Sequence, residues 1–471
     1  MNKQPSRNSI NRRDFFKLAG GAVIVVAGAS IMPQFLRKTL LPEQVVGAAS
    51  NYDLFFAGTD GWMHLPPTPG IPPFFPDDLA PAPFNTYIFG FRNLTTFVDT
   101  PGFPLQDKII NQKMKAQHNA PFFWVDQFDP INPKDFKVQL TNLGLALRPD
   151  LTDSHTLHWH GFRNVIPYFD GEPTGSVSVP VGQLFTYVYR PRDPGTYMYH
   201  CHVEDIEHVT MGMNGLVFVR PLQNGNTLYY PSGKYAYNDG DGSTGYDREF
   251  PVFLSEIWAQ GHWGDSHIQE SLWYNFKADF SLLNGRVYPD TLLPNSPIDL
   301  AASTSALTIQ TNPDTGDLLT NSSDNPALNA RYQELQYQPH SALITCNAGE
   351  RVLLRFANLG FREAAMTFAG LTVRVVGRDA TPMKGRDGTD TSYETDTLLM
   401  GAGESYDAIF TAPAHSGGAG PDVYVLYNRR YTQDDDLSTQ GQRTEIRVFP
   451  GTLGAQQHFN DAVNYEPLPL V

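Results

Sequence analysis

Histidine, cysteine and methionine are concentrated in one short part of this chain. Six of its 13 histidines lie between residues 155 and 208. They form two groups: His155, His158 and His160 in the first, and His200, Cys201, His202 and His208 in the second. Imidazole nitrogens and thiolates are the ligands that zinc and copper prefer in proteins. Two His-x-His pairs, one of them with a cysteine at its centre, favour a metal centre over hydrogen-bonded structural histidines, and they favour copper over zinc.

Strand geometry divides these residues between two sites. Successive side chains of a β-strand point to opposite faces, so residues of equal parity share a face. On a strand that ends at His202, Cys201 points one way while His200 and His202 point the other way. In the first group His158 and His160 share a face, and His155 takes the opposite one. The pattern therefore predicts two metal sites placed back to back.

The first of these sites, which we call the cysteine site, combines Cys201 and His155 with ligands from the segment that follows. One thiolate, two imidazoles and a weak thioether are the ligand set of blue (type 1) copper, where soft sulfur and constrained geometry favour exchange between Cu(I) and Cu(II). His208 and Met213 are the available completing ligands. Met211 is the alternative axial ligand, and we favour Met213, five residues beyond His208.

The second site, which we call the histidine site, has no sulfur. Its expected ligands are His158, His160, His200 and His202. An all-imidazole set suits copper that meets dioxygen or an oxyanion.

The segments that must position these ligands occur twice in the chain. Each is short, rich in β-branched or aromatic residues, and bounded by glycine, proline or asparagine, which is typical of strands at sandwich spacing. The paired segments are 136–144 with 352–360, 157–161 with 366–370, 184–190 with 406–411, 195–199 with 422–426, and 216–219 with 445–449. The repeat predicts an all-β chain of two Greek-key β-sandwich domains.

We place the first domain at 51–222 and the second at 250–450, with a polar linker at 223–249. Residues 295–335 are expected to form a surface insertion, and 451–471 a C-terminal tail. The length of 471 residues agrees with two domains.

The formal net charge of −15 becomes −20 once residues 1–49 are left out. Such a negative surface repels phosphate backbones, so nucleic acid is a poor partner.

The N-terminal segment predicts export from the cytoplasm. Arg12 and Arg13 precede Phe15-Phe16-Lys17 and an apolar stretch from Leu18 to Met32, as in a twin-arginine signal. Small residues at 47–49 fit a cleavage site, so 1–49 is expected to be a signal peptide of a periplasmic or extracellular protein. A permanent anchor helix is the alternative.

The contexts of Cys201 and Cys346 argue against a disulfide, and Cys346 is expected to be a buried thiol.

Taken together, these motifs resemble the multicopper oxidase family, which implies cupredoxin domains over 51–450. The His200-Cys-His202-Val stretch with Glu207-His208 and Met211-Gly-Met213 is most similar to two-domain members that carry type 1 copper in their first domain. The resemblance implies that Cys201 passes electrons to His200 and His202. In the family these positions bind type 3 copper of a trinuclear cluster that reduces dioxygen to water, and His158 would serve type 2 or type 3 copper.

The chain also departs from the family pattern. A trinuclear cluster requires eight histidines, half of them from a second His-rich domain. The second-domain positions aligned with the first histidine group are Ala364, Thr367 and Ala369, and those aligned with the second group are Tyr427, Asn428 and Arg429. One chain therefore supplies four of the eight.

The other histidines show no His-x-His pairing and are expected at surface or turn positions. They are His64, His118, His262, His267, His340, His415 and His458. His262 and His267, in an acidic and aromatic loop, are the one pair that could add ligands.

Three functions fit this pattern. The first is a copper oxidoreductase that oxidises a donor at the cysteine site and passes electrons to the histidine site, with dioxygen as acceptor and with an oligomer or His-rich partner subunit completing the cluster. The second is a blue-copper electron-transfer or copper-binding protein. The third is a nitrite-reductase-like enzyme, and it is weakened because nitrite reductases have an Asp and an Ala-like residue where this chain has His158 and His202. The donor would be a small molecule or metal ion. Glu204, Asp205 and Glu207 are either a solvated acidic turn, which we favour, or a group that attracts a cationic donor.

Overall fold

The computed structural model describes residues 52–456 with interruptions. The residues left out are 1–51, 69, 96, 98–101, 103, 270, 294, 296–309, 312–317, 320–332, 431–440, 455 and 457–471. The expected signal peptide, most of the expected insertion and most of the tail thus lie outside the described residues. Among the helices of the described part, none is long and apolar enough to cross a membrane.

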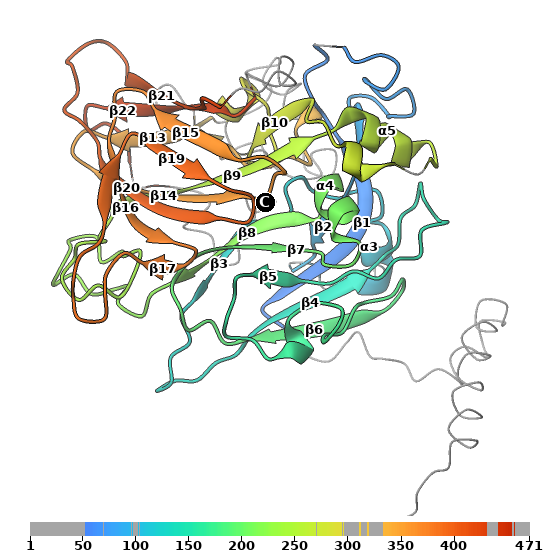
Figure 1. The fold of residues 1–471 in the computed structure, drawn as a ribbon, viewed down its shortest axis with the longest axis horizontal. Coiled ribbons are helices and arrows are strands. Elements are labelled where there is room, and N and C mark those ends of the chain that lie inside the picture. The colour runs from blue at the N-terminus through green and yellow to red at the C-terminus, as the bar shows by residue number, and fades with distance from the viewer. Residues whose placement is uncertain are drawn as a thin grey trace, which may run out of the picture. The chain divides into compact units, whose positions relative to one another are not determined.

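The first domain is a sandwich of two sheets (Figure 1). Its first sheet has the order β2 (Thr86–Asn93), β1 (Leu54–Met63), β4 (Phe136–Asn142), β6 (Leu184–Tyr189). Its second sheet has the order β3 (Phe123–Asp126), β8 (Asn214–Arg220), β7 (Gly195–His200), β5 (His158–His160). Aromatic and aliphatic side chains of both sheets fill the space between them, and Cys201 and Met213 belong to that core.

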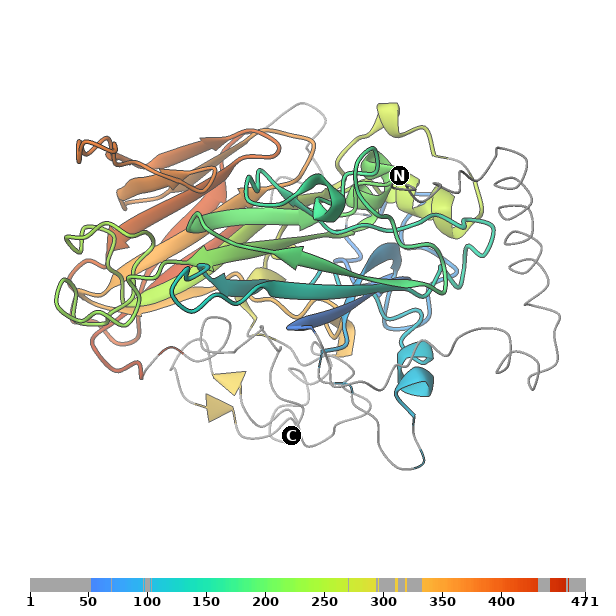
Figure 2. The same ribbon diagram turned by 90° about the horizontal axis from the view of Figure 1, so that it is seen from below.

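The second domain is also a sandwich, and its strands lie beside those of the first domain in Figure 2. One sheet runs β10 (Phe280–Leu283), β9 (Arg248–Ile257), β14 (Arg351–Asn358), β20 (Ser405–Thr411), β16 (Val373–Arg378), β17 (Thr381–Pro382), with β18 (Tyr393–Thr395) also paired to β16. The other runs β13 (Ile344–Asn347), β22 (Arg443–Phe449), β21 (Asp422–Asn428), β15 (Ala364–Phe368), β19 (Thr397–Met400). β11 (Gln310–Thr311) and β12 (Leu318–Leu319) pair separately.

Both sandwiches follow the same chain path. β1 pairs in parallel with β4 as β9 does with β14, and β3 pairs in parallel with β8 as β13 does with β22. Each segment of the repeat seen in the sequence contains a strand, and the predicted all-β fold of two Greek-key sandwiches is confirmed.

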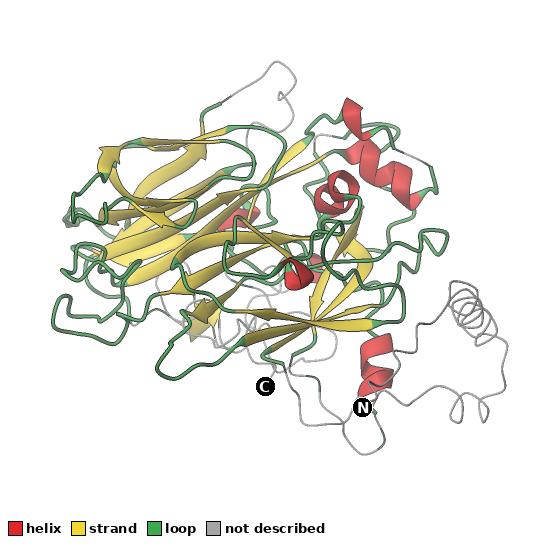
Figure 3. Cartoon of the chain, turned by 60° about the horizontal axis from the view of Figure 1, so that its bottom comes forward, coloured by secondary structure: helices red, strands yellow, loops and turns green. Residues whose placement is uncertain are grey.

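Helices are few among the described residues and short (Figure 3). They are α3 (Leu105–Ile110), α4 (Asp205–Met211), α5 (Ala259–Ser266) and the 3₁₀ turns η1 (Pro167–Phe169), η2 (Trp273–Asn275) and η3 (Asp290–Leu292). The acidic, aromatic loop expected around His262 is wrong in part, because His262 lies within α5 and His267 at its C-terminal cap. Glycines within the segment, Gly261 and Gly264, concealed the helix from sequence reasoning.

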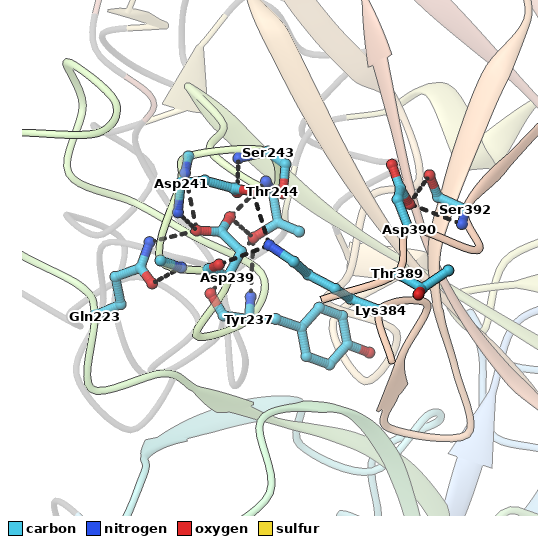
Figure 4. A network of polar contacts seen from close by, with 12 residues as sticks. Gln223, Tyr237, Asp239, Asp241, Ser243, Thr244, Lys384, Thr389, Asp390 and Ser392 are labelled. Carbon is cyan, nitrogen blue, oxygen red and sulfur yellow. Dashed lines mark hydrogen bonds and ion pairs between the residues drawn. The ribbon is translucent and has the colours of Figure 1, made fainter. Parts of the chain in front are cut away.

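The polar linker at 223–249 packs on the second domain and contributes buried side chains to a small core there. Buried side chains of Ala236, Tyr237 and Tyr246 form a small core with residues of β14, β16 and β20. In the same segment the Asp239 carboxylate accepts hydrogen bonds from the backbone N–H groups of Gly242 and Thr244, at 2.9 and 2.6 Å. Lys384 of the second domain donates to the carbonyl of Asp239 (Figure 4). The next strand, β9, begins at Arg248, two residues before the expected domain start.

Candidate metal centres

The cysteine site is assembled from three separate segments. Cys201 directly follows β7, His208 lies in α4, and His155 forms an isolated bridge with Val179 before β5. The Sγ atom of Cys201 lies 3.3 Å from Nδ1 of His208 and 4.0 Å from Nδ1 of His155. The three ligand atoms all lie within 4.8 Å of one another. All three residues are buried, so these atoms converge on one enclosed point.

The surroundings keep both imidazoles in the form that binds metals. Burial lowers the pKa of His208 to about 4 and holds the pKa of His155 well below its usual value. Burial likewise raises the pKa of the Cys201 thiol to about 11, so a metal ion must displace that proton on binding. A soft thiolate with two neutral imidazoles is a donor set that fits copper.

The place of Met213 beside Cys201 is set by the pairing of β7 with β8. His200 pairs with Asn214, and the N–H of Cys201 donates to the carbonyl of Met213 at 3.1 Å. Residues directly opposite each other in antiparallel strands point to the same face. Met213 therefore shares the inner face with Cys201, whereas Met211 belongs to α4. Both methionines are fully buried.

The histidine site lies on the outer face of the same sheet. Ring nitrogens of His158, His160 and His200 all lie within 4.8 Å of one another. His202 is not part of that set, although its ring centre lies 5.0 Å from that of His158 and 5.5 Å from that of His200. The structure thus brings three of the four expected residues into ligand range and places the fourth beside them.

Hydrogen bonds orient two of these rings. Nδ1 of His158 lies 2.7 Å from the carbonyl oxygen of Asp170, and Nδ1 of His200 lies 2.8 Å from that of Cys201. Each carbonyl accepts the Nδ1–H, which leaves Nε2 with the lone pair that a metal ion needs. Because His200 is bonded to Cys201 both covalently and through this hydrogen bond, the two sites are directly connected.

The second domain has the same strand pairing without the ligands. Thr367 pairs with Tyr427 between β15 and β21, just as His158 pairs with His200 between β5 and β7. The hydroxyl of Thr367 lies 3.1 Å from that of Thr397. The equivalent pair of strands therefore carries a hydroxyl and a phenol group where the first domain carries imidazoles.

The expectation that the remaining histidines lie at the surface or in turns is wrong for four of them. His118, His262 and His340 are almost fully buried, and His64 is 8% exposed. His118 and His262 interact, and burial lowers the pKa of His118 to about 3. His262 and His267 do not form a common site: Nδ1 of His262 lies 2.6 Å from the carbonyl of Tyr87, and Nε2 of His267 lies 3.1 Å from Asp78. His458 lies outside the described residues.

An acidic group beside α4 was missed in the sequence. Asp265 of α5 is 3% exposed and accepts a hydrogen bond from Arg148 at 3.0 Å. Burial, with a contribution from Glu207, raises the pKa of Asp265 to about 8. No local motif marks this residue, since its position depends on α5 packing beside the first domain.

Two sequence models described as multicopper oxidase match this chain, one at residues 138–224 and the other at residues 299–449, together about half of its length. The chain belongs to the multicopper oxidase family. Copper is the metal of this family, and its members are oxidoreductases.

Individual relatives match over limited lengths or at low identity. The laccase-like multicopper oxidase 1 of Thermothelomyces thermophilus is 36% identical over 78 residues, which are 16% of this chain and 11% of that protein. The chain matches less than a fifth of the length of the curated relatives. The blue copper oxidase of Nitrosomonas europaea has a TM-score of 0.50 at 19% identity, covering 84% of this chain and 85% of that one. The multicopper oxidase mgLAC also has a TM-score of 0.50 at 19% identity, covering 88% and 90%. These two structures share the fold.

Proposed function

We propose that this chain is an exported copper-dependent oxidoreductase, which takes single electrons from a donor at the cysteine site and delivers them to the histidine site, where dioxygen is the acceptor. The observation that carries this proposal is that one thiol and two imidazole nitrogens converge at an enclosed point. The residue that carries the thiol is covalently bonded to histidines of the histidine site. Copper bound at Cys201 would supply rapid one-electron exchange.

The chain's own residues account for the path between the two sites. Cys201 faces inward, while its neighbours His200 and His202 belong to the outward group, so the peptide itself connects donor side and acceptor side. The short bond from His200 to the Cys201 carbonyl fixes this geometry. Glu204 and Asp205 are exposed on α4 and its cap, and they support a cationic small-molecule or metal-ion donor.

A second candidate is a blue-copper electron-transfer protein. It is favoured by one specific observation, the absence of imidazoles from the described part of β15 and β21 in the second domain. In this case the histidine site would bind metal weakly or only together with a His-rich partner subunit.

Metal analysis with absorption spectroscopy of the purified protein tests the proposal. We expect an intense blue absorption in the wild type, with one or two coppers in addition to the blue one. Cys201→Ser should abolish the colour and leave the fold intact, as His155→Ala and His208→Ala should. His158→Ala is the matched control: it removes a histidine of the other site and should keep the blue colour while lowering the copper content.

A copper-loaded wild type without this absorption would contradict the cysteine site. Slow dioxygen consumption that accelerates with a His-rich partner subunit would support the oxidoreductase. No consumption under any condition, with the blue colour present, would favour the electron-transfer protein. Export is the part of the proposal that Arg12 and Arg13 support, and Arg12→Lys combined with Arg13→Lys should retain the protein in the cytoplasm.

A further inference from the structure

A cavity of about 490 Å³ lies where the first domain, the linker and the second domain meet. The first domain contributes the turn between β6 and β7, the linker contributes residues within 237–244, and the second domain contributes β16 and the hairpin between β17 and β18. None of the expected copper ligands lines it. Its volume is typical of a site for a small molecule.

The charge of the cavity wall is opposite to that of the chain. Five of the lining residues are basic and three are acidic, a net of +2, whereas residues 50–471 together carry −20. The basic residues are Arg163, Arg192, Arg374, Lys384 and Arg386, and the acidic ones are Asp193, Asp239 and Asp390. Positive charge is therefore a local feature of this cavity, which general composition does not explain.

Two of the basic groups are neutralised by carboxylates. Nζ of Lys384 lies 2.7 Å from Oδ2 of Asp241 (Figure 4), and Nη2 of Arg374 lies 2.8 Å from Oδ2 of Asp390. The Asp239 carboxylate accepts hydrogen bonds from the residues of its own loop. These charges are satisfied within the wall, so the positive excess lies on the other three arginines.

The two arginines of the first domain are weakly compensated. Nη2 of Arg163 lies 3.6 Å from Asp193, whose carboxylate accepts a closer hydrogen bond from Asn164 at 2.7 Å. The guanidinium of Arg192 lies over the Phe128 ring, 5.8 Å from its centre, and has no carboxylate partner among the described residues. Stacking on a ring occupies the face of a guanidinium and leaves its N–H edge available.

The arginine of the second domain is also uncompensated. Arg386 lies in the hairpin between β17 and β18 and has no hydrogen bond or ion pair within the part of the chain that the structure describes. The neighbouring Asp387 carboxylate accepts instead from the N–H and the hydroxyl of Thr389, at 3.0 and 2.9 Å. Arg192 and Arg386 are both exposed, so a ligand in solution can reach them.

The two sides of the cavity are held in place without a ligand. Nε2 of Gln127 donates to the carbonyl of Arg192 at 2.6 Å, and Nδ2 of Asn238 in the linker donates to Oε1 of Gln127 at 2.7 Å. A Cβ atom built on Gly195 would lie 2.6 Å from Cα of Ala380, so the start of β7 rests directly on the second domain. A wall that is already ordered reduces the entropy cost of binding.

We propose that this cavity binds a small polyanion, a molecule that carries two or more phosphate or carboxylate groups, and that Arg163, Arg192 and Arg386 hold it. A guanidinium presents a planar fork of N–H groups that matches the paired oxygens of a carboxylate or a phosphate. Because these arginines come from both domains, the bound anion bridges the junction and stabilises the folded protein. The copper sites take no part in this binding.

Isothermal titration calorimetry of the purified protein with fructose 1,6-bisphosphate and with propane-1,2,3-tricarboxylate tests the proposal. We expect one molecule bound per chain, and the tighter of the two probes identifies phosphate or carboxylate as the preferred group. Arg192→Gln and Arg386→Gln should each weaken binding by about tenfold, as expected for the loss of one charge-assisted hydrogen bond. Arg190→Gln is the matched control: Arg190 is exposed and close in the chain to Arg192, but it pairs with Asp135 and does not line the cavity, so affinity should not change.

Thermal unfolding gives a second readout. The tighter probe should raise the Tm of the wild type and of Arg190→Gln, relative to sodium chloride at equal ionic strength, and should raise that of Arg386→Gln less. Without a probe the four proteins should unfold at similar temperatures, because the substituted side chains are exposed. Three results would each overturn the proposal: no binding of either probe, undiminished affinity in both Arg192→Gln and Arg386→Gln, which would place the probe elsewhere, or an equal loss in Arg190→Gln, which would show a general effect of charge. None of these measurements depends on oxidation of a donor, so the result is independent of the proposed function.

Discussion

Met213 lies opposite Cys201 at the point where β7 ends and β8 begins, and it follows Gly212, the C-terminal cap of α4. Backbone pairing holds its Cα atom on the same face as Cys201, so the position of this residue does not depend on a metal. A thioether at this place would be a weak ligand for copper, and it would tune the reduction potential more than it would hold the metal.

Met213→Leu should therefore keep the blue colour and raise the reduction potential, by about 60 mV if the change equals a tenfold shift in a one-electron equilibrium. The branched side chain is similar in volume and leaves the core packed. Redox titration of the blue absorption measures the shift. Met211→Leu is the control and should leave the potential unchanged; the reverse outcome would make Met211 the axial ligand.

At the scale of single residues, the alternation of side chains along a strand was sufficient to separate two sites. It grouped His155 with Cys201, and His158 with His200, because parity is a local property of the backbone. The same reasoning could not find that His118 and His262 are buried. Their burial depends on β2, α4 and α5 packing together, which no short sequence pattern encodes.

The element that completes the cysteine site is α4 with the turn that follows it. The helix ends at Gly212, whose φ of 124° is a conformation that other residues rarely adopt. A Cβ atom there would lie 2.6 Å from the carbonyl oxygen of Phe89 and 2.7 Å from Nδ1 of His118. Gly212 thus lets α4 approach β2 closely while it places His208 on one side and Met213 on the other.

Gly212→Ala should destabilise the protein by more than the roughly 1–3 kcal/mol expected for backbone strain alone, because it adds a steric clash. It should also weaken or shift the blue absorption. Urea unfolding and the spectrum measure both effects. Gly225→Ala is the matched control: its φ of 91° is also positive, but nothing lies within 4 Å of the added carbon. Equal losses in the two variants would show that the close approach to His118 has no energetic role.

At the scale of secondary-structure elements, the sequence predicted the strands but not the helices. Each repeated segment contains a strand, because β-branched and aromatic residues between glycines and asparagines give a strong local signal. The asparagine that closes β4 and the one that closes β14 even have the same role, since Asn142 and Asn358 each accept a bond from the N–H of the glycine two residues later. α5 carries two glycines and gives little signal of its own, so the burial of its residues His262 and Asp265 was missed.

At the scale of the molecule, a buried group of charges joins the two domains. Glu249 of β9 accepts hydrogen bonds from Arg355 of β14 and from Arg220, the last residue of β8 in the first domain. Arg355 also contacts Asp407 and lies over the Phe218 ring of the first domain, 4.6 Å from its centre. Glu249 and Arg355 are fully buried. The sequence predicted two domains but not this contact, because each member is an ordinary strand residue until the sandwiches meet.

Removing the charge of Glu249 should therefore loosen the junction between the domains. Burial by itself raises the pKa of this carboxyl, but attraction by Arg355 and Arg220 outweighs it and lowers the pKa to about 2. Glu249→Gln would leave both guanidinium groups buried without this counter-charge, and we expect a loss of about 3–5 kcal/mol in the free energy of unfolding. Because the folded-state pKa is depressed, the stabilisation is complete above the unfolded value of about 4.3 and is lost as the pH falls toward 2, so the two proteins should converge in acid. Asp135→Asn removes the partly exposed partner of Arg190 and should cost at most about 1 kcal/mol. Urea unfolding between pH 3 and pH 7 measures all three proteins, and a gap between wild type and Glu249→Gln that does not narrow in acid would contradict the role assigned to this charge.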